Sequence, residues 1–182
     1  MGDKAVPGRD FRIETERLIL RPSEADDAAR LSEIQSDWTV VRHMRFPPWP
    51  PDPAALAQWV AGHAEEWIAG AGYRFCVLRE GRIIGVCDID EIAGRQGDLG
   101  YWFEAAAWGQ GHAREASTAV VRFAFDTLGL VRLTSGAAID NPASGAVLLR
   151  LGFQPVARVM RFAQPLGREV PYLTYELSTD AA

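Results

Sequence analysis

The sequence has few cysteines, and their spacing matches no cysteine framework. Among its 182 residues are two, Cys76 and Cys87, and each lies inside an apolar run. Neither belongs to a C-x-x-C or C-x-x-H pattern, which argues against a disulfide framework and against a zinc site. We expect both to be small buried residues of strands, and we expect no metal site.

Long hydrophobic runs and an excess of basic residues are also missing. No uncharged stretch is long enough to span a bilayer, and residues 1–10 lack the apolar segment of a secretory signal. The 19 basic and 24 acidic residues leave a formal net charge of −5, which gives no positive field for a phosphate backbone. We therefore expect a cytoplasmic protein that binds neither nucleic acid nor a membrane.

The length and composition are those of one globular domain. Apolar residues make up 48% of the chain and charged residues 24%, which is typical of a soluble fold with a core. No internal repeat or low-complexity segment divides the chain. The polar start, with Pro7 and Gly8, predicts a flexible tail over residues 1–10, followed by a single domain over residues 11–182.

Hydrophobic periodicity predicts an α+β domain. Strands are expected over residues 11–21, 73–79, 82–92, 98–104, 131–139, 154–162 and 170–177. Helices are expected over residues 23–35 and 53–69, after Ala113 as far as Leu128, and from Asn141 to Leu151. Residues 36–53, where aromatic residues are interleaved with prolines, predict an ordered loop.

The segment W-G-Q-G-H-A, from Trp108 to Ala113, has the features of an anion site. The first N–H groups of the helix that follows have no partner within it, and the helix dipole favours negative charge. Gly109 and Gly111 keep side chains away, so a phosphate can approach these groups closely. The segment is neither a Walker loop nor the G-x-G-x-x-G of dinucleotide folds, and a simple turn is the alternative interpretation.

This segment and three others resemble one family. It resembles motif A of the GNAT acetyltransferases, Q/R-x-x-G-x-G/A, with Trp108 in place of the leading Gln or Arg. The chain also contains T-E-R-L-I-L-R-P at 15–22, G-Y-W-F at 100–103 and D-N-P-A-S-G-A-V-L-L-R-L-G-F at 140–153. Together they look like the branch of the ribosomal-protein N-terminal acetyltransferases, the RimJ/RimL type. The resemblance implies a mixed, mostly antiparallel sheet with a splayed parallel strand pair and about four flanking helices.

The resemblance also implies acetyl-CoA as co-substrate. Backbone groups of the splayed strand would pair with the pantetheine arm, and the 108–114 loop would surround the pyrophosphate. Asn141 would contact the arm and Ser144 would lie near the thioester sulfur, although helix capping alone also explains N-P-x-S. The expected cofactor-binding residues are Tyr101, Trp102, Phe103, Trp108, Gly109, Gln110, Gly111, His112, Ala113, Arg114, Asn141 and Ser144.

Direct attack of an amine on a thioester needs a group that takes a proton from the ammonium. Asp98, just before L-G-Y-W, is the first candidate, because several relatives place a carboxylate there; a solvated charge at a strand start is the alternative. Glu104, at the other end of the strand, is a further candidate, as are Asp88 and Asp90 on the preceding strand.

The same reaction needs a donor to the developing oxyanion and a proton for the leaving thiolate. In this superfamily a backbone N–H usually serves the oxyanion. Many GNAT enzymes supply the proton from a tyrosine, but the aligned position here is Leu148. Ser144 or water is then expected to take that role.

The acceptor is expected to be a primary amine, either a protein N-terminus or a small molecule. Its pocket would come from the first two helices, the aromatic loop and the last hairpin, with Trp38, His43, Phe46 and Trp49 as candidate contacts. Aromatic walls and net negative charge suit a cation. A non-catalytic acyl-CoA-binding domain is the alternative function, and both a monomer and a homodimer are compatible with the sequence.

Overall fold

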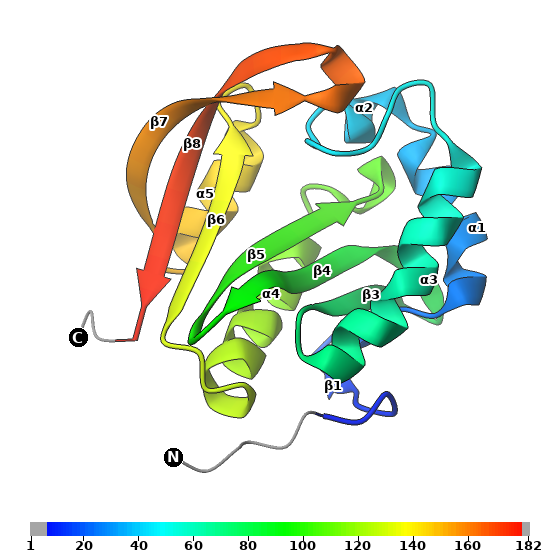
Figure 1. The fold of residues 1–182 in the computed structure, drawn as a ribbon, viewed down its shortest axis with the longest axis vertical. Helices are drawn as coiled ribbons and strands as arrows, with labels where there is room; N and C mark the ends of the chain where they lie inside the picture. The colour runs from blue at the N-terminus through cyan, green and yellow to red at the C-terminus, as the bar shows by residue number, and fades with distance from the viewer. Residues whose placement is uncertain (1–6, 180–182) are drawn as a thin grey trace.

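Eight strands form one sheet in the order β1-β2-β3-β4-β5-β6-β8-β7. The computed structural model describes residues 7–179. The strands are β1 (Ile13–Glu14), β2 (Ile19–Pro22), β3 (Tyr73–Arg79), β4 (Arg82–Ala93), β5 (Gln96–Phe103), β6 (Arg132–Ala138), β7 (Gln154–Ala163) and β8 (Arg168–Ser178). The helices are α1 (Ala28–Gln35), α2 (Trp38–Val41), α3 (Pro53–Ala69), α4 (His112–Arg122) and α5 (Pro142–Arg150). Figure 1 shows their arrangement.

Every neighbouring pair of strands is antiparallel except β5 and β6, which are parallel. This confirms the predicted mixed sheet with one parallel pair. The parallel pair arises because α4 crosses over between β5 and β6, whereas tight hairpins join β3 to β4 and β4 to β5.

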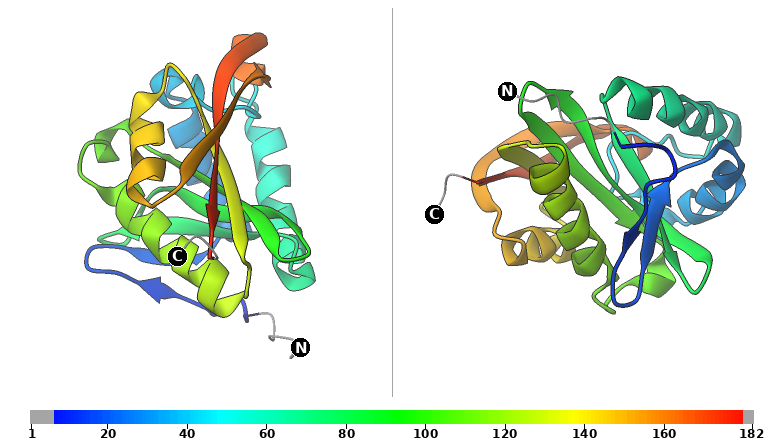
Figure 2. Two further views of the ribbon diagram at one scale, coloured as in Figure 1. Left: turned by 90° about the vertical axis from the view of Figure 1, so that its left-hand side faces the viewer. Right: turned by 90° about the horizontal axis from the view of Figure 1, so that it is seen from below.

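The sheet is covered on both faces, as the two views of Figure 2 show. Helices α1 and α3 lie on one face, and α4 and α5 lie on the other; we call these the α1/α3 face and the α4/α5 face. Alternate residues of a strand point to opposite faces. Thus Cys76 packs among α1 and α3 residues, whereas Cys87 is buried in the larger cluster with α4. Both cysteines are free and buried, as expected.

The N-terminal region differs from its prediction. Residues 11–21 form no single strand: β1 and β2 pair antiparallel through a turn in which Thr15 Oγ1 accepts from the Leu18 N–H at 3.0 Å. Residues 1–6 of the predicted tail lie outside the described residues. Residues 7–10 contact the domain, since Trp67 Nε1 donates to the Pro7 carbonyl at 2.6 Å and the Arg9 guanidinium lies over the Trp67 ring.

The aromatic loop contains a helix that the periodicity did not predict. Asp37 begins it by accepting a hydrogen bond from the Thr39 N–H, and α2 then runs for 4 residues. Its one turn is too short to show a repeating apolar pattern. The helix after Ala113 also divides, because α4 continues as a π-helical turn over Phe123–Thr127. Among residues 7–179, none of the helices combines the length and apolar character that crossing a bilayer would take.

Candidate active site

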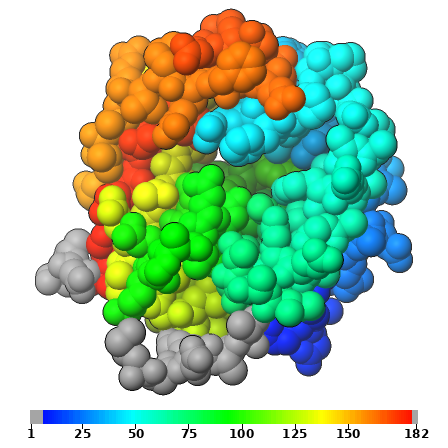
Figure 3. All heavy atoms as spheres, viewed as in Figure 1, coloured from blue at the N-terminus to red at the C-terminus, as the bar shows by residue number. Residues whose placement is uncertain are grey.

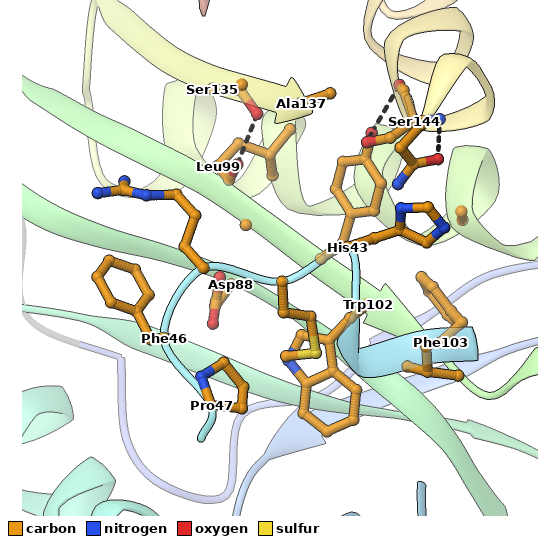
Figure 4. Close-up of a pocket in the computed structure, with 18 of the residues that line it drawn as sticks. His43, Phe46, Pro47, Asp88, Leu99, Trp102, Phe103, Ser135, Ala137 and Ser144 are labelled. Carbon is orange, nitrogen blue, oxygen red and sulfur yellow. Dashed lines mark hydrogen bonds between the residues drawn. The ribbon is translucent and has the colours of Figure 1, made fainter. Parts of the chain in front are cut away.

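The site begins where β5 and β6 separate, which we call the fork. The two strands pair only at Gln96, Gly97 and Asp98 of β5. One residue further on, Ser135 Oγ bridges the gap by donating to the Leu99 carbonyl at 2.8 Å (Figure 4). Beyond that bridge a cleft of about 1490 Å³ passes between the strands and is lined by residues from both faces of the sheet. Figure 3 shows the hollow between the segment after α2 (cyan) and the central strands (green).

The main chain of β5 exposes hydrogen-bonding groups to the fork. Because main-chain groups alternate in direction along a strand, Tyr101 faces the same way as Leu99. Phe103 also faces the fork, and its carbonyl accepts from Trp108 Nε1 at 2.9 Å. The main chain of Trp102 points to β4 instead, as does that of Glu104, whose N–H donates to the Ile84 carbonyl. Of the three expected backbone contacts, two therefore face the cleft.

The glycine-containing loop before α4 is held from outside by the N-terminal hairpin. Arg17 donates to the Gln110 carbonyl at 2.9 Å and to Glu115 of α4 at 2.7 Å, and Thr15 donates to the same carboxylate at 2.6 Å. The Gln110 side chain bonds to the Ala106 carbonyl and to Arg79. It therefore braces the loop and does not line the cleft, unlike the rest of the 108–114 segment.

The loop backbone has the form that an anion site needs. Gly109 and Gly111 have φ values of 72° and 82°, which side chains disfavour. No atom lies within 4 Å of where a Cβ on Gly109 would be, so the space in front of it is open. The loop's geometry therefore fits a phosphate group at the start of α4.

Helix α5 brings two hydroxyl groups together at the cleft. Asn141 caps the helix by accepting from the Ser144 N–H at 3.3 Å. The Tyr101 hydroxyl lies 2.9 Å from Ser144 Oγ and donates to the Ser144 carbonyl at 2.9 Å. Figure 4 shows the bonds at Ser144. Leu148 is fully buried, so neither its chemistry nor its position supplies a proton.

Asp98 lies at the end of the paired part of the fork. It stands opposite Asp90 on one side and Thr134 on the other, and Thr134 Oγ1 donates to its carboxylate at 3.3 Å. Burial, with the charges of Asp90 and Glu91, raises its pKa to about 7. No cationic group within residues 7–179 forms an ion pair with it. Asp98 can therefore exchange a proton near neutral pH.

A buried ion network lies beside Asp98 on the α1/α3 face. Arg74 binds Glu66 at 2.8 Å, Asp88 at 3.0 Å and Asp90 at 2.9 Å. A Cβ on Gly100 would lie 2.3 Å from Asp88 Oδ1, so the close approach of this carboxylate requires the glycine. Burial raises the pKa of Asp88. Arg74 thus occupies Asp88 and Asp90, two of the four carboxylates proposed for acid–base work.

Other expected site residues lie elsewhere. Glu104 forms ion pairs with Arg30 and Arg82, and its carboxylate does not line the cleft. Trp38 and Trp49 contact each other, with ring centroids 5.0 Å apart, outside the cleft lining. His43 and Phe46 do line it.

Comparisons with known proteins agree with this geometry. A family model described as the acetyltransferase (GNAT) domain matches residues 17–154. The chain belongs to the GNAT acetyltransferase family. It is 28% identical over 170 residues to p20 of Bacillus licheniformis, an uncharacterised N-acetyltransferase, covering 91% of this chain and 94% of that protein.

Solved structures show the same fold. A ribosomal-protein-S5-alanine acetyltransferase from Vibrio fischeri has a TM-score of 0.84 at 19% identity, over 94% of this chain and 98% of that one. The RimL ribosomal L7/L12 α-N-protein acetyltransferase in complex with coenzyme A has a TM-score of 0.83 at 19% identity, over 94% and 100%. GNAT enzymes use acetyl-CoA as co-substrate, and this chain is an N-acetyltransferase by its family.

The GNAT resemblance did not reveal every residue of the cleft. Arg74, Arg45, Arg161 and Tyr172 all line it, and none was expected. Arg74 faces the same side of β3 as Cys76, which is buried, and Leu78, which is half-buried, so the alternation along this strand indicated a buried charge. The other three come from the aromatic loop and the last hairpin, where no motif marks them.

Proposed function

We propose that this chain acetylates a primary amine by direct attack on acetyl-CoA, with Asp98 as the group that accepts the amine's proton. The observation that carries the proposal is the position of Asp98. It lies at the end of the paired part of the fork, in the acidic wall of the α1/α3 face, without an ion-pair partner among residues 7–179, and its pKa is about 7. A carboxylate with this pKa matches the operating pH of a general base.

The residues of the α4/α5 face fit the co-substrate. When bound, acetyl-CoA supplies a thioester acyl group that reacts with an amine. The backbone N–H groups at Gly109, Gly111 and the start of α4 would hold its pyrophosphate. The main chain of Tyr101 would hold the arm, and its N–H is positioned to donate to an oxyanion in the fork.

The hydroxyl pair on this side supports a proton source. Ser144 Oγ and Tyr101 Oη lie 2.9 Å apart, and burial raises the pKa of the tyrosine, which keeps it protonated. The pair therefore offers exchangeable protons in a chain that has Leu148 at the position of the tyrosine used by many GNAT enzymes. The tyrosine of the pair, Tyr101, belongs to β5 and not to α5.

The acceptor side favours a cation. Asp88, Asp90, Glu91 and Asp98 line one wall, which suits a protonated amine as it enters. Solved relatives of the same fold are named as ribosomal-protein acetyltransferases, and this supports a protein or peptide N-terminus as acceptor. A small amine is the second acceptor class.

Mass spectrometry of acetyl transfer tests the proposal. The protein and acetyl-CoA are incubated with one panel of N-terminal peptides and small amines, and the Asp98→Asn variant is run beside them. Acetylated peptides support the proposed acceptor, whereas labelling confined to small amines supports the second class. If nothing is acetylated while CoA still binds by calorimetry, the chain is a non-catalytic acyl-CoA-binding domain. The buried Leu148, at the position of a proton-donating tyrosine, is the observation that favours this alternative.

A further inference from the structure

We propose that the acceptor end of the cleft contains an anion subsite formed by Arg45, Arg161 and Tyr172. It would select amines that carry a carboxylate two or three residues from the reacting nitrogen. The inference rests on the proposed function, because it names the acceptor of the same site. The three residues lie outside the GNAT motifs described above, and in this proposal they determine which acceptor is bound.

Arg45 is held in the cleft without an acidic partner. Its carbonyl accepts from the Gln164 N–H at 2.8 Å, which joins the segment after α2 to the β7–β8 connection. Its guanidinium lies 4.7 Å from the Phe46 ring centroid and 5.9 Å from that of Tyr172. Its Nε is buried and has no hydrogen-bond partner within residues 7–179. A buried guanidinium nitrogen is costly to leave unpaired, so a ligand acceptor atom would stabilise it.

Arg161 supplies the second positive charge. It stands opposite Val170 on β8, two residues before Tyr172, and both arginines act on the Tyr172 hydroxyl electrostatically. No carboxylate of the described chain forms an ion pair with Arg161 or Arg45. Arg161 is an exposed residue that lines the cleft, and its guanidinium and that of Arg45 can together hold a carboxylate through charge-assisted hydrogen bonds.

Gly136 directs Tyr172 toward Asp98. Tyr172 stands opposite Ala138 of β6, yet a Cβ on Gly136 would lie 2.2 Å from Tyr172 Cε1. The ring therefore leans back along β6 over the glycine, toward the position of Thr134 and Asp98. The charge of Asp98 also reaches the Tyr172 hydroxyl. The glycine is thus needed for the ring to lie between the two ends of the site.

The register gives the length of the acceptor. Asp98 pairs with Thr134, and Tyr172 pairs with Ala138, four residues further along β6. That separation is roughly 13 Å at about 3.3 Å per residue, and the leaning ring shortens it. An extended peptide of two or three residues covers roughly 7 to 10 Å. The reacting amine at Asp98 therefore places a carboxylate two or three residues away near the arginines.

The charges at the two ends complement such a ligand. Asp98 lacks a cationic partner among residues 7–179, and Arg45 and Arg161 lack an anionic one, whereas the neighbouring Arg74 is saturated by three carboxylates. A peptide with a positive amine and a nearby negative carboxylate would pair both ends. A purely cationic acceptor would leave the arginines unpaired.

Matched peptides test the subsite. Two amidated five-residue peptides begin with serine and alanine and differ only in glutamate or glutamine at the third position. A second pair, of serine and two alanines, ends in a free carboxylate or an amide, and distinguishes a side-chain from a C-terminal carboxylate. The kcat/KM of each is measured with the wild type, Arg45→Gln, Arg161→Gln and Arg158→Gln. Arg158 is the control because it lies on β7, exposed, and points to the opposite face.

We expect the wild type to prefer at least one carboxylate peptide over its neutral partner by roughly ten-fold or more. Arg45→Gln and Arg161→Gln should lose that preference through KM, whereas the Arg158→Gln control should keep both the preference and the wild-type kcat/KM. Equal wild-type rates within both pairs, or a preference that survives both variants, would overturn the subsite while leaving the acetyltransferase function intact.

If no peptide is acetylated, the proposed peptide acceptor fails, and calorimetry decides the subsite separately. The four peptides are then titrated into the protein saturated with CoA. Tighter binding of a carboxylate peptide that Arg161→Gln abolishes supports the subsite. Equal binding within each pair overturns it.

Discussion

Asp98 and Arg74 show how two neighbouring side chains acquire opposite roles. Arg74 forms ion pairs with Asp88 and Asp90, which holds both carboxylates in place as structural charges. Asp98 stands opposite Asp90 and is repelled by its negative charge, but Arg74 forms no ion pair with Asp98 that would offset this repulsion. The network therefore serves the proposed base indirectly, because Arg74 is occupied with other carboxylates and does not pair with Asp98.

Replacing Asp98 with asparagine should remove the proton acceptor and keep the shape and the bond from Thr134. We expect kcat to fall by roughly two to four orders of magnitude, with the affinity for CoA within about two-fold of the wild type. In the wild type, kcat/KM should rise with pH through about 7, because the carboxylate form is the active one. Glu169→Gln, on an exposed position of β8, is the control, and an unchanged Asp98→Asn rate would exclude this residue as the base.

The same substitution should stabilise the fold. The pKa of Asp98 is about 7 in the folded chain against 3.8 for an ordinary aspartate, so the folded state binds more protons between these values. The free energy of unfolding then falls as pH rises through that window. We expect Asp98→Asn to gain about 1 to 3 kcal/mol over the wild type at pH 8 and nothing at pH 4, measured by urea denaturation. A gain of equal size at both pH values would contradict the assignment.

Among the structural elements, the loop before α4 depends on the hairpin that braces it. Arg17 and Thr15 come from the turn between β1 and β2, and both bind Glu115 in the first turn of α4. The T-E-R-L motif of the sequence therefore acts through the loop, and not through contact with the cleft.

Gly111→Val tests the loop. A valine at φ of 82° would strain and shift the loop backbone, and its Cβ would lie 3.4 Å from the Arg17 guanidinium that braces the loop, so CoA binding by calorimetry should weaken by roughly 100-fold or more. Gly94→Val is the matched control: its φ is 61° and its Cβ meets open space, but it lies in the β4–β5 hairpin at the closed end of the fork. If both variants bind CoA equally, the loop does not hold the phosphates.

The elements that the sequence predicted well were those with strong local signals. The β3–β4 hairpin at Glu80 and Gly81, and the Gly70 end of α3, are where the patterns placed them. The turn between β1 and β2 was missed because it contains no glycine or proline, and a threonine side chain closes it instead. Its apolar neighbours continued the strand pattern without a visible break.

The candidate site of the whole molecule could be predicted only in part. The residues proposed to bind the co-substrate lie within contiguous motifs, so they could be singled out from the sequence. The proposed acceptor residues come from the loop after α2, from β7 and from β8, and they meet only because the tertiary fold closes over the fork. Arg45 looks like any loop arginine, and the glycine that lets Tyr172 lean inward lies 36 residues before it, a separation that no local pattern spans.

The passage of the cleft through the sheet has a kinetic consequence. The cleft is lined from both faces of the sheet, so in the proposed function the co-substrate and the acceptor enter from opposite faces and are present together. Double-reciprocal plots of rate against acetyl-CoA concentration, at several fixed acceptor concentrations, should therefore intersect. Intersecting lines mean that both substrates are bound before transfer and that no acetylated protein forms. Free CoA should compete with acetyl-CoA and not with the amine, whereas parallel plots would mean that the acetyl group rests on the protein first.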